Sequence, residues 1–528
     1  MTVIKNYDKI NYTMEKVIAL TGVTGAMGGE VLLSLMRSPE NFKVRCVVFD
    51  AEKKIPAFVK KTMKKYRKRI YAFRGNIACR EDCEKLLEGA DYLIHCASLI
   101  PPKSDHDPQG TYLSNFVGTK NLVDTVIKNG NKTAFVHIAT VAMYGHRGYP
   151  HVWGRVGDPI ISSDYDCYSL YKLKAERYVL ESGLEKFVSL RQTAVLHKYM
   201  FANNMKDGLM FHTSWNCPLE WVTDADSGVL CKNLVERDLA GKLDGFWNAV
   251  YNIGGGQSCR VTGFETLDDC FSLLMGTGVK KYFKPDWNIP RNFHGVWFYD
   301  SDVLENFLHF RSESFTDFWQ RLHKKYPYFK LAKIVPPAVI SKFAFKRLFK
   351  NTNAPLYWVK HNKEGRIKAF FGGKDKFESI GTDWGKFPLL SESEEYGELK
   401  DFSNAEKYLL NHGYDESKPL ESLTLEDFSE AAAFRGGKCV ETRFSGNLHA
   451  KIKWQCREGH IFESTPYAVL KGGYWCPHCC EPKPWRYGAL AKDIPFYAQV
   501  YFDTHDESEV NDVYPLSDDE DDFIVNKK

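Results

Sequence analysis

Residues 16–29, KVIALTGVTGAMGG, run from a short apolar stretch straight into a turn rich in glycine. The apolar stretch predicts a buried strand, and residues 28–36 predict the helix that follows the turn. Gly22, Gly25 and Gly28 stand between strand and helix in a GxxGxxG array. Such glycines allow a tight turn and a close approach of the backbone to a pyrophosphate, which the helix N-terminus then attracts.

The glycine turn therefore predicts a dinucleotide site, in which Ala26 and Met27 also lie beside the cofactor. The alternative interpretation is a purely structural turn. The position of the array, after the first strand and before the first helix, favours the cofactor.

Strand-like and helix-like stretches alternate beyond this turn. This alternation is typical of an α/β fold, here a Rossmann-type doubly wound parallel sheet. Residues 196–330 are more irregular and aromatic, so we expect them to form a small substrate-covering part. The predicted strands are 43–50, 71–77, 91–98, 134–140 and 187–195, and the predicted helices are 115–128 and 168–182.

The bulk composition sets limits on the protein's class. A net charge of +4 over 528 residues gives no general case for nucleic-acid binding. The 14 cysteines are too few for a disulfide scaffold, and five of them crowd together near the C-terminus. The first residues lack a signal-peptide core, and no apolar run is long enough to span a bilayer. We expect a cytoplasmic protein with reduced thiols.

Asp50 ends the second predicted strand, near the distance at which an acidic residue meets the adenosine ribose. A carboxylate there accepts hydrogen bonds from the ribose 2′-hydroxyl and repels a 2′-phosphate, which favours NAD. Lys53 and Lys54 could instead meet a phosphate, so NADP stays open.

Tyr168 and Lys172 are the candidate catalytic pair. Their spacing of four places both side chains on one face of the predicted helix. The ammonium of Lys172 can then stabilise a tyrosinate and lower the pKa of Tyr168, which makes the phenol a useful acid or base. The YxxxK pattern occurs five more times in the chain, so the pattern alone is weak. The alternative is an amphipathic helix with a tyrosine on its buried edge.

Residues 15–330 resemble the extended short-chain dehydrogenases/reductases, the NAD-dependent epimerase/dehydratase family. The resemblance rests on eight stretches in the family's order and spacing. These are TGVTGAMG (21–28), GNI (75–77), DYLIHCAS (91–98), NFVGTKNL (115–122), HIATVAMYG (137–145), YSLYKLKAE (168–176), LRQT (190–193) and YNIGGG (251–256).

The resemblance implies further site residues. Thr140 matches the position that hydrogen-bonds the substrate oxygen, and Asn115 matches an asparagine near the nicotinamide ribose. Asn76 and Ile77 match the adenine end, although an aspartate is usual where Asn76 stands. The turn that passes the cofactor after the fourth strand matches Cys96, Ala97 and Ser98.

The stretch at 194–222 is dense in aromatic residues and methionine, and it lacks the diphosphate-binding turn of sugar-nucleotide epimerases. A mostly apolar pocket suits a hydrophobic or moderately polar alcohol or ketone. The sequence therefore favours an NAD(P)-dependent oxidoreductase of a small molecule. Two alternatives remain: a nucleotide-sugar epimerase or dehydratase with tightly bound NAD, and a cofactor-sensing binding protein.

A small module over residues 401–490 follows, and we expect it to be helical at first and zinc-ribbon-like at its end. Cys456 and His460 form a CxxxH knuckle, and Cys476 and Cys479 form a CxxC knuckle. Two knuckles of this kind commonly bind tetrahedral zinc, and four protein ligands make such a zinc structural. Cys439, His478 and Cys480 are spare. The module could dock a protein partner or stabilise a homodimer.

Two further segments have a distinct composition. Residues 331–400 form an amphipathic extension or linker, of which 331–350 could touch a membrane surface; the alternative is a helix packed on the preceding domain or a partner subunit. Residues 503–528 are acidic and predict a disordered tail.

Overall fold

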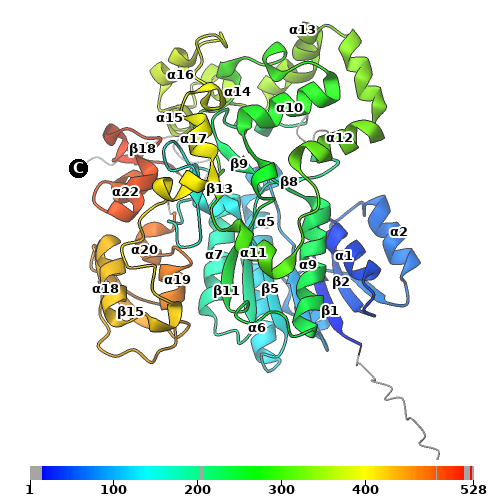
Figure 1. Ribbon diagram of the computed structural model, residues 1–528, viewed down its shortest axis with the longest axis vertical. Coiled ribbons are helices and arrows are strands. Elements are labelled where there is room, and N and C mark those ends of the chain that lie inside the picture. The colour runs from blue at the N-terminus through cyan, green and yellow to red at the C-terminus, as the bar shows by residue number, and fades with distance from the viewer. Residues whose placement is uncertain (1–14, 201–205, 483, 516–523, 526–528) are drawn as a thin grey trace, which may run out of the picture.

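The computed structural model describes residues 15–200, 206–482, 484–515 and 524–525 (Figure 1). Its centre is a sheet of seven parallel strands in the order β11-β7-β5-β4-β1-β2-β3. The order changes direction between β1 and β4, which is where a doubly wound sheet opens a crevice for its ligand. The predicted Rossmann-type fold is thus confirmed. The strands are β1 (Val17–Thr21), β2 (Lys43–Phe49), β3 (Ile70–Gly75), β4 (Tyr92–His95), β5 (Ala134–Thr140), β7 (Phe187–Gln192) and β11 (Ala249–Ile253).

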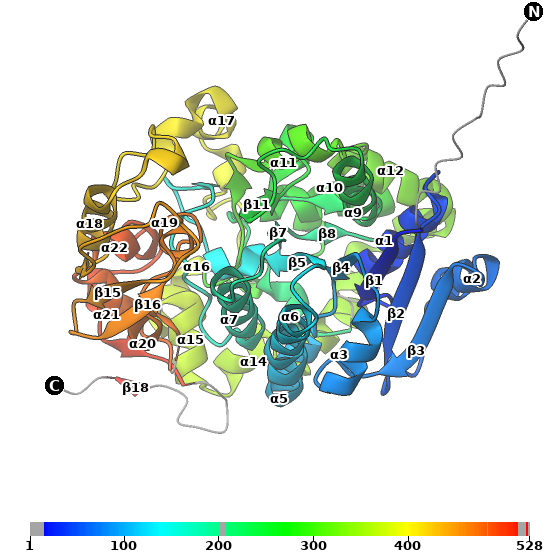
Figure 2. The same ribbon diagram turned by 90° about the horizontal axis from the view of Figure 1, so that it is seen from below.

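Helices cover both faces of this sheet, as Figure 2 shows. One face carries α1 (Ala26–Arg37) and α9 (Asp224–Leu239), which pack their leucine and valine side chains on the strands. The other face carries α3 (Arg80–Leu87), α6 (Gly118–Lys128) and α7 (Cys167–Glu181). Both faces of a parallel sheet are buried, which explains why the strand sequences read as nearly continuous apolar runs. Helix α2 (Ala57–Lys65) flanks the β2–β3 edge.

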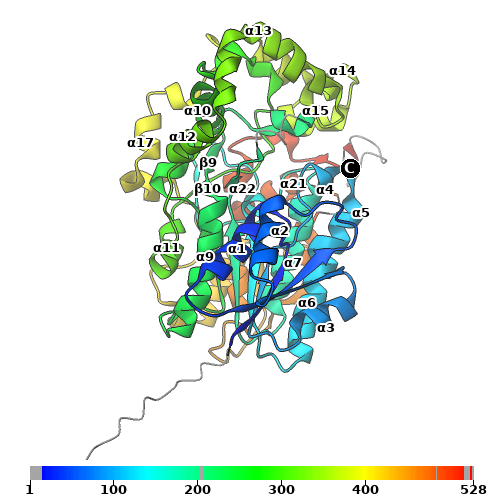
Figure 3. The same cartoon turned by 90° about the vertical axis from the view of Figure 1, so that its right-hand side faces the viewer.

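A second layer of structure stands over the carboxyl ends of the strands and has its own aromatic core (Figure 3). It combines short strands and helices from residues 195–400. The expected linker at 331–400 belongs to this layer, because its buried side chains, such as Phe345 and Leu348, join the same core. Its main elements are β8 (Val195–Leu196), β9 (Pro218–Glu220), β10 (Val222–Thr223), β12 (Arg260–Thr262), α10 (Gly263–Met275), α12 (Phe315–Lys325), α13 (Pro337–Ile340), α14 (Pro355–Lys360), α15 (Glu364–Phe371), α16 (Lys374–Ile380) and α17 (Tyr396–Lys400). Helix α11 (Ser301–Leu308) packs instead against the sheet, beside α9 and β11.

The C-terminal module packs beside α7 (Figure 2). It contains the antiparallel strands β14 (Gly437–Cys439), β15 (Ile452–Cys456) and β16 (Ile461–Ser464). The first part of the module forms α18 (Leu425–Phe434), which is preceded by a short 3-10 turn, Phe402–Tyr408. Further short helices follow, α19 (Pro466–Leu470), α20 (Pro477–Cys480), α21 (Tyr487–Ala491) and α22 (Pro495–Tyr501).

The prediction of a disordered tail is wrong for residues 503–515. Asp503 lies 3.0 Å from the imidazole of His151, and Glu509 forms a buried ion pair of 2.6 Å with Arg291. Tyr514 exchanges main-chain hydrogen bonds with Trp485. Acidic residues that look solvated in the sequence thus serve as partners for basic side chains of the main domain. Residues 516–523 and 526–528 lie outside the described residues.

Across the described residues, no helix is both long and apolar enough to cross a membrane.

Candidate active site and metal centre

A cavity of about 440 Å³ opens at the carboxyl ends of β1, β4, β5 and β7. The glycine turn lines it at one end, through Gly22, Gly25 and Gly28, and Ala26 and Met27 lie there as well. Thr140, Tyr168 and Lys172 line it further along. Residues far apart in the sequence therefore meet in a single space at the switch point of the sheet.

The backbone of the turn requires glycine at two of the three positions. Gly22 has a φ of +71° and packs against the backbone of Ala97, so a Cβ there would lie 2.6 Å from the Ala97 nitrogen. A Cβ on Gly28 would lie 2.2 Å from the carbonyl oxygen of Gly22. Gly25 precedes α1, whose N-terminus has no side-chain cap. Its free N–H groups can bind the pyrophosphate of a dinucleotide, so this cradle fits the expected cofactor.

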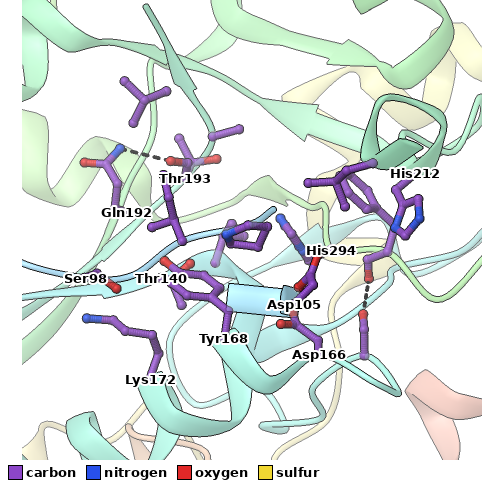
Figure 4. A pocket seen from close by; sticks show the side chains of 18 of the residues that line it. Ser98, Asp105, Thr140, Asp166, Tyr168, Lys172, Gln192, Thr193, His212 and His294 are labelled. Atoms are coloured by element: carbon purple, nitrogen blue, oxygen red, sulfur yellow. Dashed lines mark hydrogen bonds between the residues drawn. The ribbon is translucent and has the colours of Figure 1, made fainter. Parts of the chain in front are cut away.

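Tyr168 and Lys172 lie on the first turns of α7 and point into the cavity (Figure 4). Thr140 ends β5 and lies next to Tyr168 in the same view. The Thr140 hydroxyl accepts a hydrogen bond from the Ala142 N–H. The Lys172 ammonium donates to the carbonyl of Ile138 at 2.6 Å. This bond holds the lysine head beside the end of β5.

Burial dominates the electrostatics of this pair. It raises the pKa of the Tyr168 phenol to about 12, although hydrogen bonding to Thr140 acts in the opposite direction. It lowers the pKa of the Lys172 ammonium to about 8. The sequence had led us to expect a tyrosine with a lowered pKa. The structure differs because the loss of solvent around the phenol outweighs the neighbouring groups.

The turn after β4 passes the cavity as predicted by the resemblance, and Cys96 and Ser98 line it. Ala97 does not line it, and its N–H donates to the Thr21 hydroxyl instead. Asn115 lies behind this turn. Its amide group donates to the Leu99 carbonyl at 2.9 Å and accepts from the Leu99 N–H at 2.7 Å. Asn115 thus positions the turn rather than facing the cavity.

The residues predicted for the adenine end lie outside the cavity. Asp50 is exposed just beyond β2, and Arg74 donates to its main-chain carbonyl at 2.9 Å. Asn76 accepts from the Ala78 N–H through its side chain, and Ile77 packs against Gly118. Only Asp50 among these three presents a charged group to solvent at the strand end.

Sequence reasoning missed the polar groups at the far end of the cavity. Asp105 and Asp166 lie side by side there, with His294 next to them (Figure 4). Burial and the repulsion between the two carboxylates raise the pKa of Asp105 to about 7, and burial raises the pKa of Asp166 to about 6. Asp164 and Arg366 also line this end. No local motif marks these residues, because they come from separate loops and helices.

The aromatic stretch at 194–222 divides between the cavity and the core. Trp215 is buried, and its indole donates to the Pro285 carbonyl, so it belongs to the core. His212 lines the cavity but is already bonded to the Asn353 carbonyl at 2.7 Å. Val195, Met200 and Trp221 provide an apolar wall.

Cys456, His460, Cys476 and Cys479 converge in the C-terminal module, with their ligand atoms within 4.8 Å of one another. The Cys456 and Cys479 sulfurs are 3.8 Å apart, and the His460 Nδ1 lies 3.3 Å from the Cys479 sulfur. A tetrahedral site with ligand distances of about 2.0–2.3 Å has edges of about 3.3–3.8 Å. The four groups therefore fit a zinc ion. Neither Cys439 nor Cys480 belongs to this group.

Comparison with known proteins finds similarity over part of the chain. Residues 18–208 match the model of the NAD dependent epimerase/dehydratase family. A curated relative, the human sterol-4-alpha-carboxylate 3-dehydrogenase, decarboxylating, is 24% identical over 173 residues, which are 33% of this chain and 42% of the relative. The matched segment thus spans less than half of that relative's length.

Solved structures also match about three-fifths of the chain. One is dTDP-glucose 4,6-dehydratase from Bacillus anthracis in complex with NAD, at 18% identity and a TM-score of 0.47, covering 60% of this chain and 98% of the other. Another is UDP-glucuronic acid 4-epimerase from Bacillus cereus in complex with UDP-glucuronic acid and NAD. It is 18% identical, has a TM-score of 0.47, and the match covers 60% of this chain and 99% of the other.

Proposed function

We propose that residues 18–208, which match the NAD dependent epimerase/dehydratase family model, form an NAD-binding enzyme domain, and that the protein is an NAD(P)-dependent oxidoreductase that interconverts an alcohol and a ketone. One observation carries this proposal. The glycine turn, Thr140, Tyr168 and Lys172 line the same cavity, so a dinucleotide on the turn and a substrate at the tyrosine would share one space.

Each of the three side chains has a distinct part in the reaction. The bound nicotinamide cofactor supplies or accepts the hydride. Tyr168 donates a proton to the substrate oxygen in ketone reduction and takes it back in alcohol oxidation. Thr140 hydrogen-bonds the same oxygen, and the charge of Lys172 stabilises the phenolate that forms. A phenol whose pKa is about 12 is protonated at neutral pH, which favours its use as the acid in reduction.

The cavity wall favours a substrate with an apolar body and a small polar end. Val195, Met200 and Trp221 would contact the body, while Asp105 and Asp166 would face the polar end. Above about pH 7 both carboxylates are ionised and would repel the diphosphate of a nucleotide sugar, which argues against such a substrate. The name of the curated relative, a sterol dehydrogenase, agrees with an apolar substrate body. A cofactor sensor without catalysis would need none of the three reacting side chains.

NAD is the preferred cofactor in this proposal. Asp50 stands exposed at the end of β2, where its carboxylate can accept hydrogen bonds from a ribose 2′-hydroxyl and repel a 2′-phosphate.

The proposal includes a structural zinc ion held by Cys456, His460, Cys476 and Cys479. The geometric fit of the ligand atoms supports it, and four protein ligands leave no open position for catalysis.

A substrate screen with both cofactors, followed at the nicotinamide absorbance, tests the proposed function. Apolar hydroxy and keto compounds should change the absorbance, and NAD should serve better than NADP. Turnover of nucleotide sugars without net change in the cofactor would instead establish an epimerase.

A further inference from the structure

The segment between α12 and α14 exposes a row of large apolar side chains. It lies at the outer end of the second layer, around α13 (Figures 1 and 3). Ile334 is 79% exposed, Phe343 67% and Leu331 64%. Tyr328, Val335 and Val339 are exposed as well. We call these six residues the apolar tip. Such a concentration of exposed apolar surface usually marks an interaction site.

The local helix types place these side chains in rows. Tyr328, Leu331 and Ile334 follow one another at intervals of three in the 3-10 helix Pro327–Ile334. A 3-10 helix has three residues per turn, so side chains at this interval point the same way. Val339 and Phe343 are four apart across α13 and the π-helical turn Ser341–Phe345. Side chains four apart also share a helix face.

The opposite side of this segment is fixed to the protein body. Phe345 is buried, and its ring centroid lies 4.7 Å from that of Phe283. Leu348 is also buried in the same aromatic core. The segment therefore has two apolar sides, of which one packs inward and the other faces solvent. The tip is part of a packed element that presents its side chains outward.

The stretch of sequence that contains the tip carries charge of one sign. Residues 318–363 contain 11 lysines and arginines and no aspartate or glutamate. Lys333, Lys342 and Lys346 are exposed within or beside the tip. The whole chain carries a net charge of only +4, so this stretch departs strongly from the average. A partner for this surface should combine negative charge with an apolar interior.

We propose that the apolar tip and its lysines bind the surface of an anionic lipid bilayer. The apolar side chains would enter the boundary between headgroups and acyl chains, while the lysines meet the negative headgroups. A nucleic acid would use the lysines but would leave the exposed Ile334 and Phe343 without a role. This surface is separate from the proposed reaction, because none of its residues lines the cavity.

Vesicle co-sedimentation of the full chain tests the proposal. The vesicles are phosphatidylcholine alone, or phosphatidylcholine with about a third phosphatidylserine. The test variant carries Leu331→Ser, Ile334→Ser and Phe343→Ser. The matched control carries Ile127→Ser, Leu239→Ser and Val303→Ser, three other exposed apolar residues. A third variant carries Lys333→Gln, Lys342→Gln and Lys346→Gln. Thermal unfolding of each variant shows whether it is folded.

The unmodified chain and the matched control should bind the anionic vesicles at least tenfold better than the neutral ones. The tip variant should lose at least tenfold in binding, and the glutamine variant should lose the preference for anionic vesicles. Absence of binding by the unmodified chain, or equal binding by the tip variant, would overturn the proposal. The proposal would also be overturned if the chain bound DNA or self-associated through the tip but did not bind vesicles. If the tip variant does not fold, the single variants Ile334→Ser and Phe343→Ser give the same decision.

Discussion

The hydroxyl of Tyr474 lies 3.0 Å from the main-chain carbonyl oxygen of Leu173, the residue next to Lys172. It also lies 2.8 Å from the carboxylate of Glu176 on the same helix. Tyr474 stands two positions before the metal-ligand candidate Cys476. Arg177 of the helix further donates to the Trp475 carbonyl at 2.8 Å. The C-terminal module is thus hydrogen-bonded to the helix that carries the candidate catalytic pair.

Loss of the metal should therefore loosen α7 as well as the module. We expect Cys479→Ser to abolish the bound zinc seen by elemental analysis and to speed hydrogen exchange of the amides in Cys167–Glu181 at least tenfold. Cys480→Ser, a neighbouring thiol outside the ligand group, is the control and should change neither. Unchanged exchange in α7 after complete metal loss would show that the module is independent of the helix.

Gly25→Val should weaken cofactor binding. A Cβ on Gly25 meets only the Gly22 carbonyl, at 3.2 Å, so the larger side chain can extend into the cavity where a pyrophosphate would lie. We expect at least a tenfold loss of NAD affinity by calorimetry, with a similar melting temperature. The control is Gly385→Val, in an exposed loop where a Cβ would meet only the Asp383 carboxylate, at 3.4 Å. Equal NAD affinity in both variants would show that the cofactor does not bind at this turn.

Asp50→Asn should reduce the preference for NAD over NADP. The substitution removes the negative charge that would repel a 2′-phosphate at the end of β2. We expect the ratio of the two affinities to fall at least tenfold. Glu52→Gln removes a charge two residues away and should leave the ratio nearly unchanged. A chain that prefers NADP before any substitution would contradict the role given to Asp50.

Asp164→Asn should change how stability depends on pH. Burial raises the pKa of the Asp164 carboxyl from 3.8 to about 7. The unfolded chain therefore loses this proton first, so the contribution of Asp164 to stability falls as pH rises from about 4 to 7. Denaturant unfolding at pH 8 should show the variant more stable by about 1–4 kcal/mol, and at pH 5 by much less. The exposed Asp375→Asn is the control. A constant difference at both pH values would contradict the assignment.

Much of the fold could be predicted because its strands, helices and glycine turn depend on residues that are close together in the sequence. Apolar strands, glycine at Gly22 and helical periodicity each follow from contacts within a few residues. The positions of Thr140, Tyr168 and Lys172 around one cavity follow from the order of the parallel strands, once the first strand and its turn are recognised.

The remaining features depend on contacts between distant segments. The pairing of Asp105 with Asp166 and that of Arg291 with Glu509 join parts of the chain that no local pattern connects. The raised pKa of Tyr168 depends on the burial of the phenol in the folded chain, which the spacing to Lys172 does not reveal. The same limit applies to the C-terminal acidic residues, whose basic partners lie in the main domain.

The central claim is that Tyr168 transfers the proton in a nicotinamide-dependent reaction. Tyr168→Phe keeps the ring and removes only the hydroxyl, so the cofactor site should remain intact. With a substrate found by the screen, we predict at least a hundredfold lower turnover in the absorbance assay and NAD affinity within twofold of the unmodified protein. Near-normal turnover in this variant would contradict the account.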